Sequence, residues 1–90
     1  MMLMIEQITS KRGTRIRLSG ELRFEHLDQV KAEVGRGGHR VALDLAEVNL
    51  VDLESIRFLN ACEAKGISVL HCSPYIRKWM SQERSRPKDA

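Results

Sequence analysis

Alternating hydrophobic and polar residues mark the first part of the chain. In residues 14–19, Ile16 and Leu18 alternate with arginines, which is the pattern of a strand with one buried face and one wet face. Residues 4–10 form a similar strand-like segment, and Gly13 lies in the short polar stretch between the two. The pattern predicts two strands joined by a hairpin turn.

The spacing of hydrophobic residues changes to a helical one at residue 24. The residues that recur at the spacing of one helix face are Phe24, Leu27, Val30 and Val34. Gly35 follows the last of them, as is typical of a helix end. The sequence therefore predicts a first helix from Phe24, with these side chains on one face.

Two further strands and two further helices follow. A third strand is expected at residues 40–45, a helix begins near Asp52 and stops at Gly66, and residues 67–71 form a fourth strand. Ser73, followed by a proline, begins the last helix. Strands linked through helices run parallel, whereas a hairpin is antiparallel. The predicted fold class is α/β, with a small mixed sheet of about four strands that has an antiparallel opening hairpin and then parallel crossovers.

The composition is that of one domain with a basic end. A chain of 90 residues can build a single hydrophobic core. Lys and Arg outnumber Asp and Glu by 15 to 12, and the whole excess lies in residues 77–90. We expect one domain over residues 1–83 and a basic, disordered tail over residues 84–90. No nucleic acid is expected to bind the neutral body, and weak binding through the tail is kept as an alternative.

The sequence offers little to a metal, a cofactor or a membrane. Cys62 and Cys72 both lie in apolar patterns, so reduced, packed thiols are expected rather than a disulfide. The three histidines lack the spacing of zinc ligands. No apolar run approaches the roughly 20 residues of a membrane span. We therefore expect a cytoplasmic protein without metal, cofactor or membrane insertion.

The predicted helix that begins at Asp52 has two different sides. The Asp52 carboxylate can accept a hydrogen bond from the helix backbone, and Glu54 adds favourable negative charge to the first turn. At about 100° per residue, the side taken to face the sheet carries Ser55, Ile56, Phe58, Leu59 and Cys62. The opposite side carries Leu53, Glu54, Arg57, Asn60, Ala61 and Ala64. This outer side is more apolar than solvation requires, which suits protein binding, unless Leu53 folds back onto the preceding loop.

A family resemblance rests on the segments around this helix. They are Leu43-Asp44-Leu45-Ala46-Glu47-Val48, Asp52, Gly66-Ile67 and Leu18-Ser19-Gly20-Glu21-Leu22. In order and spacing, the chain from about residue 5 to residue 80 resembles the STAS domain of anti-sigma factor antagonists. The resemblance implies helices mainly on one face of the sheet, and a partner-binding surface at the helix start and the neighbouring loops. The residues that it implies as partner contacts are Gly20, Glu21, Phe24, Asp52, Leu53, Glu54, Arg57 and Asn60.

The resemblance also bears on regulation. Phosphoregulated members of the family open this helix with Asp-Ser-Ser/Thr-Gly, and a partner kinase phosphorylates the residue two positions after the Asp. This chain has Asp52-Leu53-Glu54-Ser55 instead. Glu54, at the phosphoacceptor position, holds one fixed negative charge that a kinase cannot switch. Ser55 is then the remaining candidate for phosphorylation, although it points toward the expected core.

These observations lead to the hypothesis of a protein-binding regulatory module rather than an enzyme. The expected partner is an anti-sigma factor with an ATPase-fold kinase domain or, alternatively, a transporter ATPase that the domain serves as an accessory subunit. Association of two copies along a bare sheet edge is a further option, because no extra strand follows the last helix. For an enzyme, the candidates are Asp44, His71 and Cys72, whose thiol pKa a helix start can lower.

Overall fold

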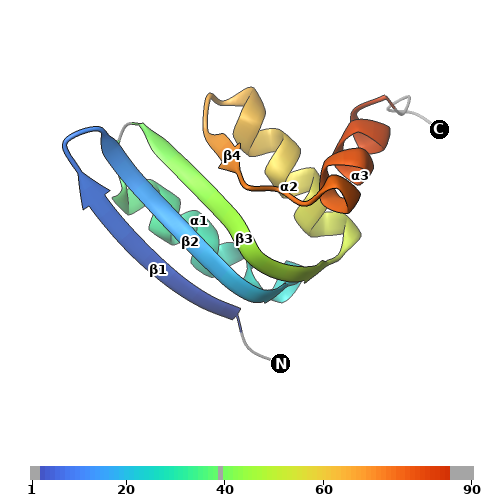
Figure 1. Ribbon diagram of the computed structural model, residues 1–90, viewed down its shortest axis with the longest axis horizontal. Coiled ribbons are helices and arrows are strands. Elements are labelled where there is room, and N and C mark those ends of the chain that lie inside the picture. Colours follow the sequence, from blue (N-terminus) through green and yellow to red (C-terminus); the bar gives the residue numbers. More distant parts are fainter. Residues whose placement is uncertain (1–2, 39, 86–90) are drawn as a thin grey trace.

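Four strands form one mixed sheet in the order β1-β2-β3-β4 (Figure 1). The computed structural model describes residues 3–38 and 40–85. Strands β1 and β2 pair antiparallel, and β3 and β4 continue the sheet in parallel. The strands are β1 (Leu3–Ser10), β2 (Gly13–Leu22), β3 (Val41–Val51) and β4 (Ser68–Leu70). The predicted α/β class with an antiparallel opening hairpin and parallel crossovers is therefore confirmed.

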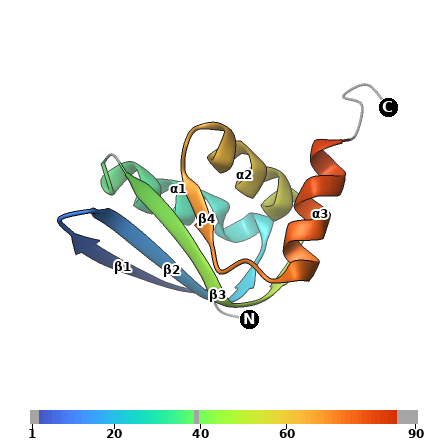
Figure 2. The ribbon, with the colours of Figure 1, turned by 45° about the horizontal axis from the view of Figure 1, so that its top comes forward.

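The helices connect and complete the sheet. They are a short 3-10 turn η1 (Phe24–His26), α1 (Leu27–Arg36), α2 (Leu53–Ala64) and α3 (Pro74–Arg84). The connections through α1 and α2 each step one strand further in the same direction, and right-handed crossovers of this kind place their helices on the same face of a sheet. Figure 2 shows both helices on one side of the sheet, with α3 packed beside α2.

The core lies between the sheet and these two helices. Alternate residues of β2 and β3 point into it, as the strand period requires, and α1, α2 and α3 each contribute one apolar face. The largest fully buried apolar side chains are Ile16, Leu18, Leu22, Val30, Leu43, Leu45, Ile56, Leu59, Ile76 and Met80. Burial of each such side chain contributes about 1.5 to 3 kcal/mol, so this layer holds α2 firmly against the sheet.

Strands β2 and β3 are longer than predicted. The third strand was expected to end at residue 45, but it continues to Val51 because β2 also continues, to Leu22, and the two ends pair with each other. Gly20 and Glu21 therefore lie in a strand and not in a turn. The pairing shifts register between them, and Gly20 has the positive φ of 102° that glycine tolerates at such an irregularity.

The start of the first helix also differs from the prediction. Phe24 begins the 3-10 turn, and the α-helix starts only at Leu27. The side chain of Phe24 is 66% exposed and does not share the buried face of Leu27 and Val30. The helical period was therefore read three residues too early, because a 3-10 turn has a different period from an α-helix.

The last helix ends close to the limit of the described residues. Arg84 is its final residue and pairs with Glu63, and the remainder of the predicted tail, residues 86–90, lies outside the described residues. No helix in the described part of the chain is long and apolar enough to cross a membrane. Both cysteines, Cys62 and Cys72, are free thiols.

Candidate partner-binding surface at the start of α2

Asp52 joins the two segments that the sequence predicted to form one surface. One carboxylate oxygen, Oδ1, accepts a hydrogen bond from the Ser55 N–H at 2.9 Å and so caps α2. The other, Oδ2, accepts from the Phe24 N–H at 2.7 Å, although Phe24 is 28 residues away in the sequence. The predicted N-cap is confirmed, and the same side chain fixes the 3-10 turn beside the start of α2.

The electrostatics of Asp52 agree with this double role. Burial by itself raises the pKa of a carboxyl group, but hydrogen bonds from Ser55 and from the Phe24 backbone outweigh it and hold the pKa of Asp52 below its ordinary value. The helix dipole favours the same charged state at an N-terminus. Asp52 is therefore ionised throughout the neutral range, and the junction keeps its charge.

The exposed ring of Phe24 stands next to this junction. The preceding residue is also held, because the Arg23 N–H donates to His26 Nδ1 at 3.2 Å and the Arg23 guanidinium pairs with Glu21 at 2.9 Å. Glu21 is consequently engaged inside the fold, with a side chain only 14% exposed. A large apolar ring is thus presented to solvent on a backbone that several hydrogen bonds restrain.

Ser55 is completely buried beneath the same junction. Its accessible surface is 0%, and its hydroxyl donates to the Leu22 carbonyl at 2.8 Å. A kinase cannot reach this oxygen while the domain is folded, and a phosphate has no space there. Ser55, the remaining candidate for phosphorylation, is therefore inaccessible in the folded domain, where its hydroxyl links α2 to the end of β2.

The exposed side of the first turn of α2 carries charge. Glu54 and Arg57 are 57% and 53% exposed in their side chains and lie 3.3 Å apart. An exposed pair of this kind stabilises the helix by only about 0.3 to 0.5 kcal/mol, so both groups remain available to a partner. Leu53 is half-buried, which is less open than the exposed leucine that was expected.

The predicted outer side of α2 is only partly open along the helix: Ala61 and Ala64 are exposed, whereas Asn60 is half-buried. Asn60 Nδ2 donates to the Met80 carbonyl at 3.0 Å, which places Asn60 against α3. Arg57 also approaches Glu83 of α3, at 3.6 Å. Asn60, which was predicted as a partner contact, is therefore half-buried against α3. The α2-start surface, as we define it, comprises Phe24, Asp52, Leu53, Glu54 and Arg57.

Two of the three groups considered for catalysis, Asp44 and Cys72, are held in contacts within the fold, and the third, His71, is exposed. Asp44 is 2% exposed and lies on the sheet face away from the helices, 3.9 Å from Arg15 and 3.8 Å from Arg17. Cys72 lies 4.0 Å from the Met80 sulfur, and burial raises its pKa, against the opposing effect of Arg77. A buried thiol with a raised pKa is a poor nucleophile. Within residues 3–38 and 40–85, no group of three or more His, Cys, Asp or Glu side chains could hold a metal ion.

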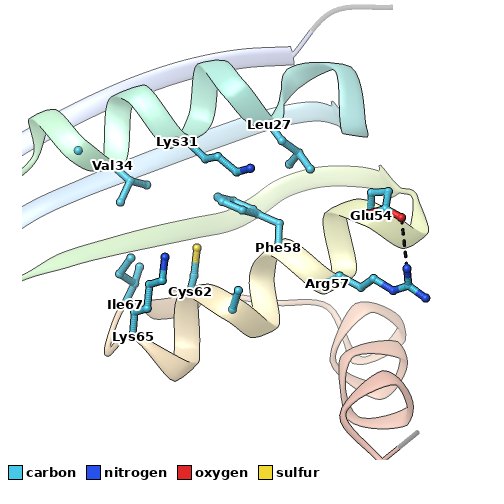
Figure 3. A pocket seen from close by; sticks show the side chains of 11 residues that line it. Leu27, Lys31, Val34, Glu54, Arg57, Phe58, Cys62, Lys65 and Ile67 are labelled. Carbon is cyan, nitrogen blue, oxygen red and sulfur yellow. Dashed lines mark hydrogen bonds and ion pairs between the residues drawn. The ribbon is translucent and has the colours of Figure 1, made fainter. Parts of the chain in front are cut away.

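Sequence reasoning missed a groove between α1 and α2. Phe58 was expected to face the core, but it is only half-buried and lines this groove together with Lys31 of α1 (Figure 3). The groove could have been expected from the sequence of α2, because its apolar face is too wide for the sheet alone to cover.

Comparison with known proteins adds no assignment: no protein-family model matches this sequence, and no curated protein matches it.

Proposed function

We propose that this chain is a protein-binding regulatory module of the STAS type, which docks a protein partner through the α2-start surface. The observation that carries the proposal is the exposed Phe24 ring, held beside α2 by the bond from its N–H to Asp52. Exposed aromatic residues are common anchors of protein interfaces, and an ordered backbone beneath the ring lowers the entropy lost on binding. The two free thiols agree with a cytoplasmic location.

Binding through this surface is constitutive in our proposal. In the family that the sequence resembles, a phosphate is added two residues after the Asp, and here that position holds Glu54, an exposed carboxylate in the first turn of α2. The next hydroxyl, Ser55, is buried. A fixed single charge has neither the bulk nor the second charge of a phosphate, so the surface stays in one state.

The surface also indicates the chemistry of its partner. Phe24 is flanked in sequence by the exposed Glu25, and Glu54 adds a second exposed carboxylate. Such a surface fits an apolar pocket with a basic rim. An anti-sigma factor with an ATPase-fold kinase domain is the partner we favour, and a transporter ATPase is the alternative.

Nucleic-acid binding through the C-terminal end is the weaker alternative. Two of its basic residues in the described part of the chain, Arg77 and Arg84, both pair with Glu63, at 3.0 and 3.2 Å. One of these two positive charges is thus compensated within the fold, which reduces the attraction for phosphates. Removal of residues 86–90 with no change in weak, salt-sensitive DNA binding would eliminate this alternative.

The proposal can be tested by affinity capture from the native cell, with identification of the retained proteins. Phe24→Ala should lose the partner that the wild type retains, while its melting temperature stays within a few degrees, because the ring makes little contact inside the fold. Tyr75→Ala is the matched control, since it removes a ring of similar exposure, 65%, from α3. Equal capture by Phe24→Ala and the wild type would refute the α2-start surface. An ATPase-fold kinase or a transporter ATPase among the captured proteins would decide between the two partner classes.

A further inference from the structure

The groove between α1 and α2 has an apolar floor and a volume of about 570 Å³ (Figure 3). That volume falls within the range of about 300 to 1,000 Å³ that is usual for small-molecule sites. The apolar side chains that line it are Leu27, Val34, Phe58, Cys62 and Ile67. They come from both helices and from the turn before β4, so the floor is formed by the body of the domain and not by a loop.

Positive charge exceeds negative charge in the lining of this groove. Glu54 and Arg57 also line it, and these two side chains pair with each other at 3.3 Å. Lys31 of α1 and Lys65 at the end of α2 are exposed, and neither forms an ion pair within the described residues. Both act electrostatically on the Cys62 thiol, and Lys31 Nζ lies 6.0 Å from the centre of the Phe58 ring. The nearby carboxylate of Glu63 already pairs with two arginines. The site therefore presents two uncompensated ammonium groups above an apolar floor.

The groove is kept open by small residues that the fold does not require. Gly35 lies in the last turn of α1 and lines the groove, yet a Cβ atom added there would meet no atom within 4 Å. Glycine in a helix costs up to about 1 kcal/mol relative to alanine. Ala61, on the α2 side, is small and exposed. The space beside Gly35 is thus left unfilled, although an added methyl group would fit there.

We propose that this groove binds a monomeric amphiphile with a carboxylate head and a single hydrocarbon chain. The chain lies on the apolar floor along Phe58, and the carboxylate is bound by Lys31 and Lys65, whose ammonium groups donate to it. A small ligand fits better than a partner helix, because α1 and α2 span only 10 and 12 residues, whereas a stable protein interface buries about 800 Å² on each side. The proposal does not require a partner docked at Phe24, which does not line the groove, although Glu54 and Arg57 of the α2-start surface do line it.

A titration of the full chain with sodium dodecanoate below its micellar concentration tests the site. Backbone amide NMR signals of Lys31, Gly35, Ala61 and Lys65 should shift, and those of the β1–β2 hairpin should not. Dodecyltrimethylammonium, with the same chain and a cationic head, should bind at least about tenfold more weakly. Acetate, which lacks the chain, should cause no shift. Equal binding of the two dodecyl compounds, or shifts outside the groove, would overturn the proposal.

Variants separate the two parts of the site. Ala61→Trp fills the groove from an exposed position and should abolish dodecanoate binding while the domain stays folded. Lys31→Gln with Lys65→Gln should weaken it at least about tenfold. Lys78→Gln, which removes an exposed lysine from α3, is the control and should bind as the wild type does. Undiminished binding by Ala61→Trp would refute the site, and so would binding only to vesicles of anionic lipid with none to monomeric dodecanoate.

Discussion

The two long sides of α2 have different surroundings: one packs against α3, and the other borders the groove to α1. Toward α3, polar contacts link the two helices: Asn60 donates a hydrogen bond to the Met80 carbonyl, and Glu63 forms ion pairs with Arg77 and Arg84. Toward α1, the two helices leave a groove with Phe58 in its wall. The difference shows that a residue on the side of α2 away from the sheet can still be covered by another helix. What is open to a ligand or a partner depends on which neighbouring helix packs there.

A matched pair of charged substitutions should give the largest contrast between the two sides. Asn60→Asp puts a carboxylate beside the Met80 carbonyl, in a part-buried interface where the Asn60 side-chain oxygen already lacks a hydrogen bond. It should cost about 3 kcal/mol of unfolding free energy. Ala61→Asp, one residue later on the exposed groove side, should cost less than about 1 kcal/mol. Urea denaturation measures both, and equal losses would mean that α3 does not close its side of α2.

Alkaline pH should destabilise the groove side through Cys62. Burial raises the pKa of Cys62 to about 11, against the opposing effects of Lys65 and Lys31 and with a small addition from Glu63. Because the unfolded thiol titrates first, the stability is fully present below about pH 9 and is lost as the pH rises toward 11. The loss is on the order of 2 kcal/mol. Denaturation midpoints of the wild type should fall more steeply between about pH 9 and pH 11 than those of Cys62→Ala. Equal slopes for the two proteins would show that Cys62 is not the cause of the loss.

Asp52→Ala tests the junction at the start of α2. The change removes the cap on the Ser55 N–H and the acceptor for the Phe24 N–H, so it should cost about 1 to 2 kcal/mol. Since the pKa of Asp52 is lowered in the fold, the wild type loses this contribution as the pH falls below the ordinary carboxyl value, and the variant does not. Thermal denaturation of both proteins at pH 7 and pH 3 measures the difference in their stability. A difference that is as large at pH 3 as at pH 7 would contradict the role given to the Asp52 carboxylate.

The smallest effect is expected at a pair of glycines near the end of α1. The Cβ atom added by Gly35→Ala would have no atom within 4 Å. The substitution should therefore stabilise the domain by up to about 0.5 kcal/mol through helix propensity. Gly37→Ala would bring its Cβ to 2.9 Å from Val41 Cγ2 and should give no such gain. If the two variants had equal stability, the space on the groove side of Gly35 would not be empty.

The sequence predicted the strand directions and the helix cap better than the surface. Alternation in β2 and the favourable Asp52 cap depend on near neighbours in the chain, and both were predicted correctly. The exposure of Phe24 and the covering of Asn60 depend on a 3-10 turn and on the placement of α3, and no local pattern encodes these. Ser55 was predicted to point inward, but its bond to the Leu22 carbonyl required the unexpected extension of β2 to be known.

The most direct test of the docking hypothesis is site-specific photo-crosslinking in the native cell. A benzophenone side chain replaces Phe24 in one variant and Tyr75 in another, so that rings of similar exposure on different elements are compared. Docking through the α2-start surface predicts a discrete crosslinked product with one protein from position 24 and none with that protein from position 75. A product formed from position 75, with none from position 24, would contradict it.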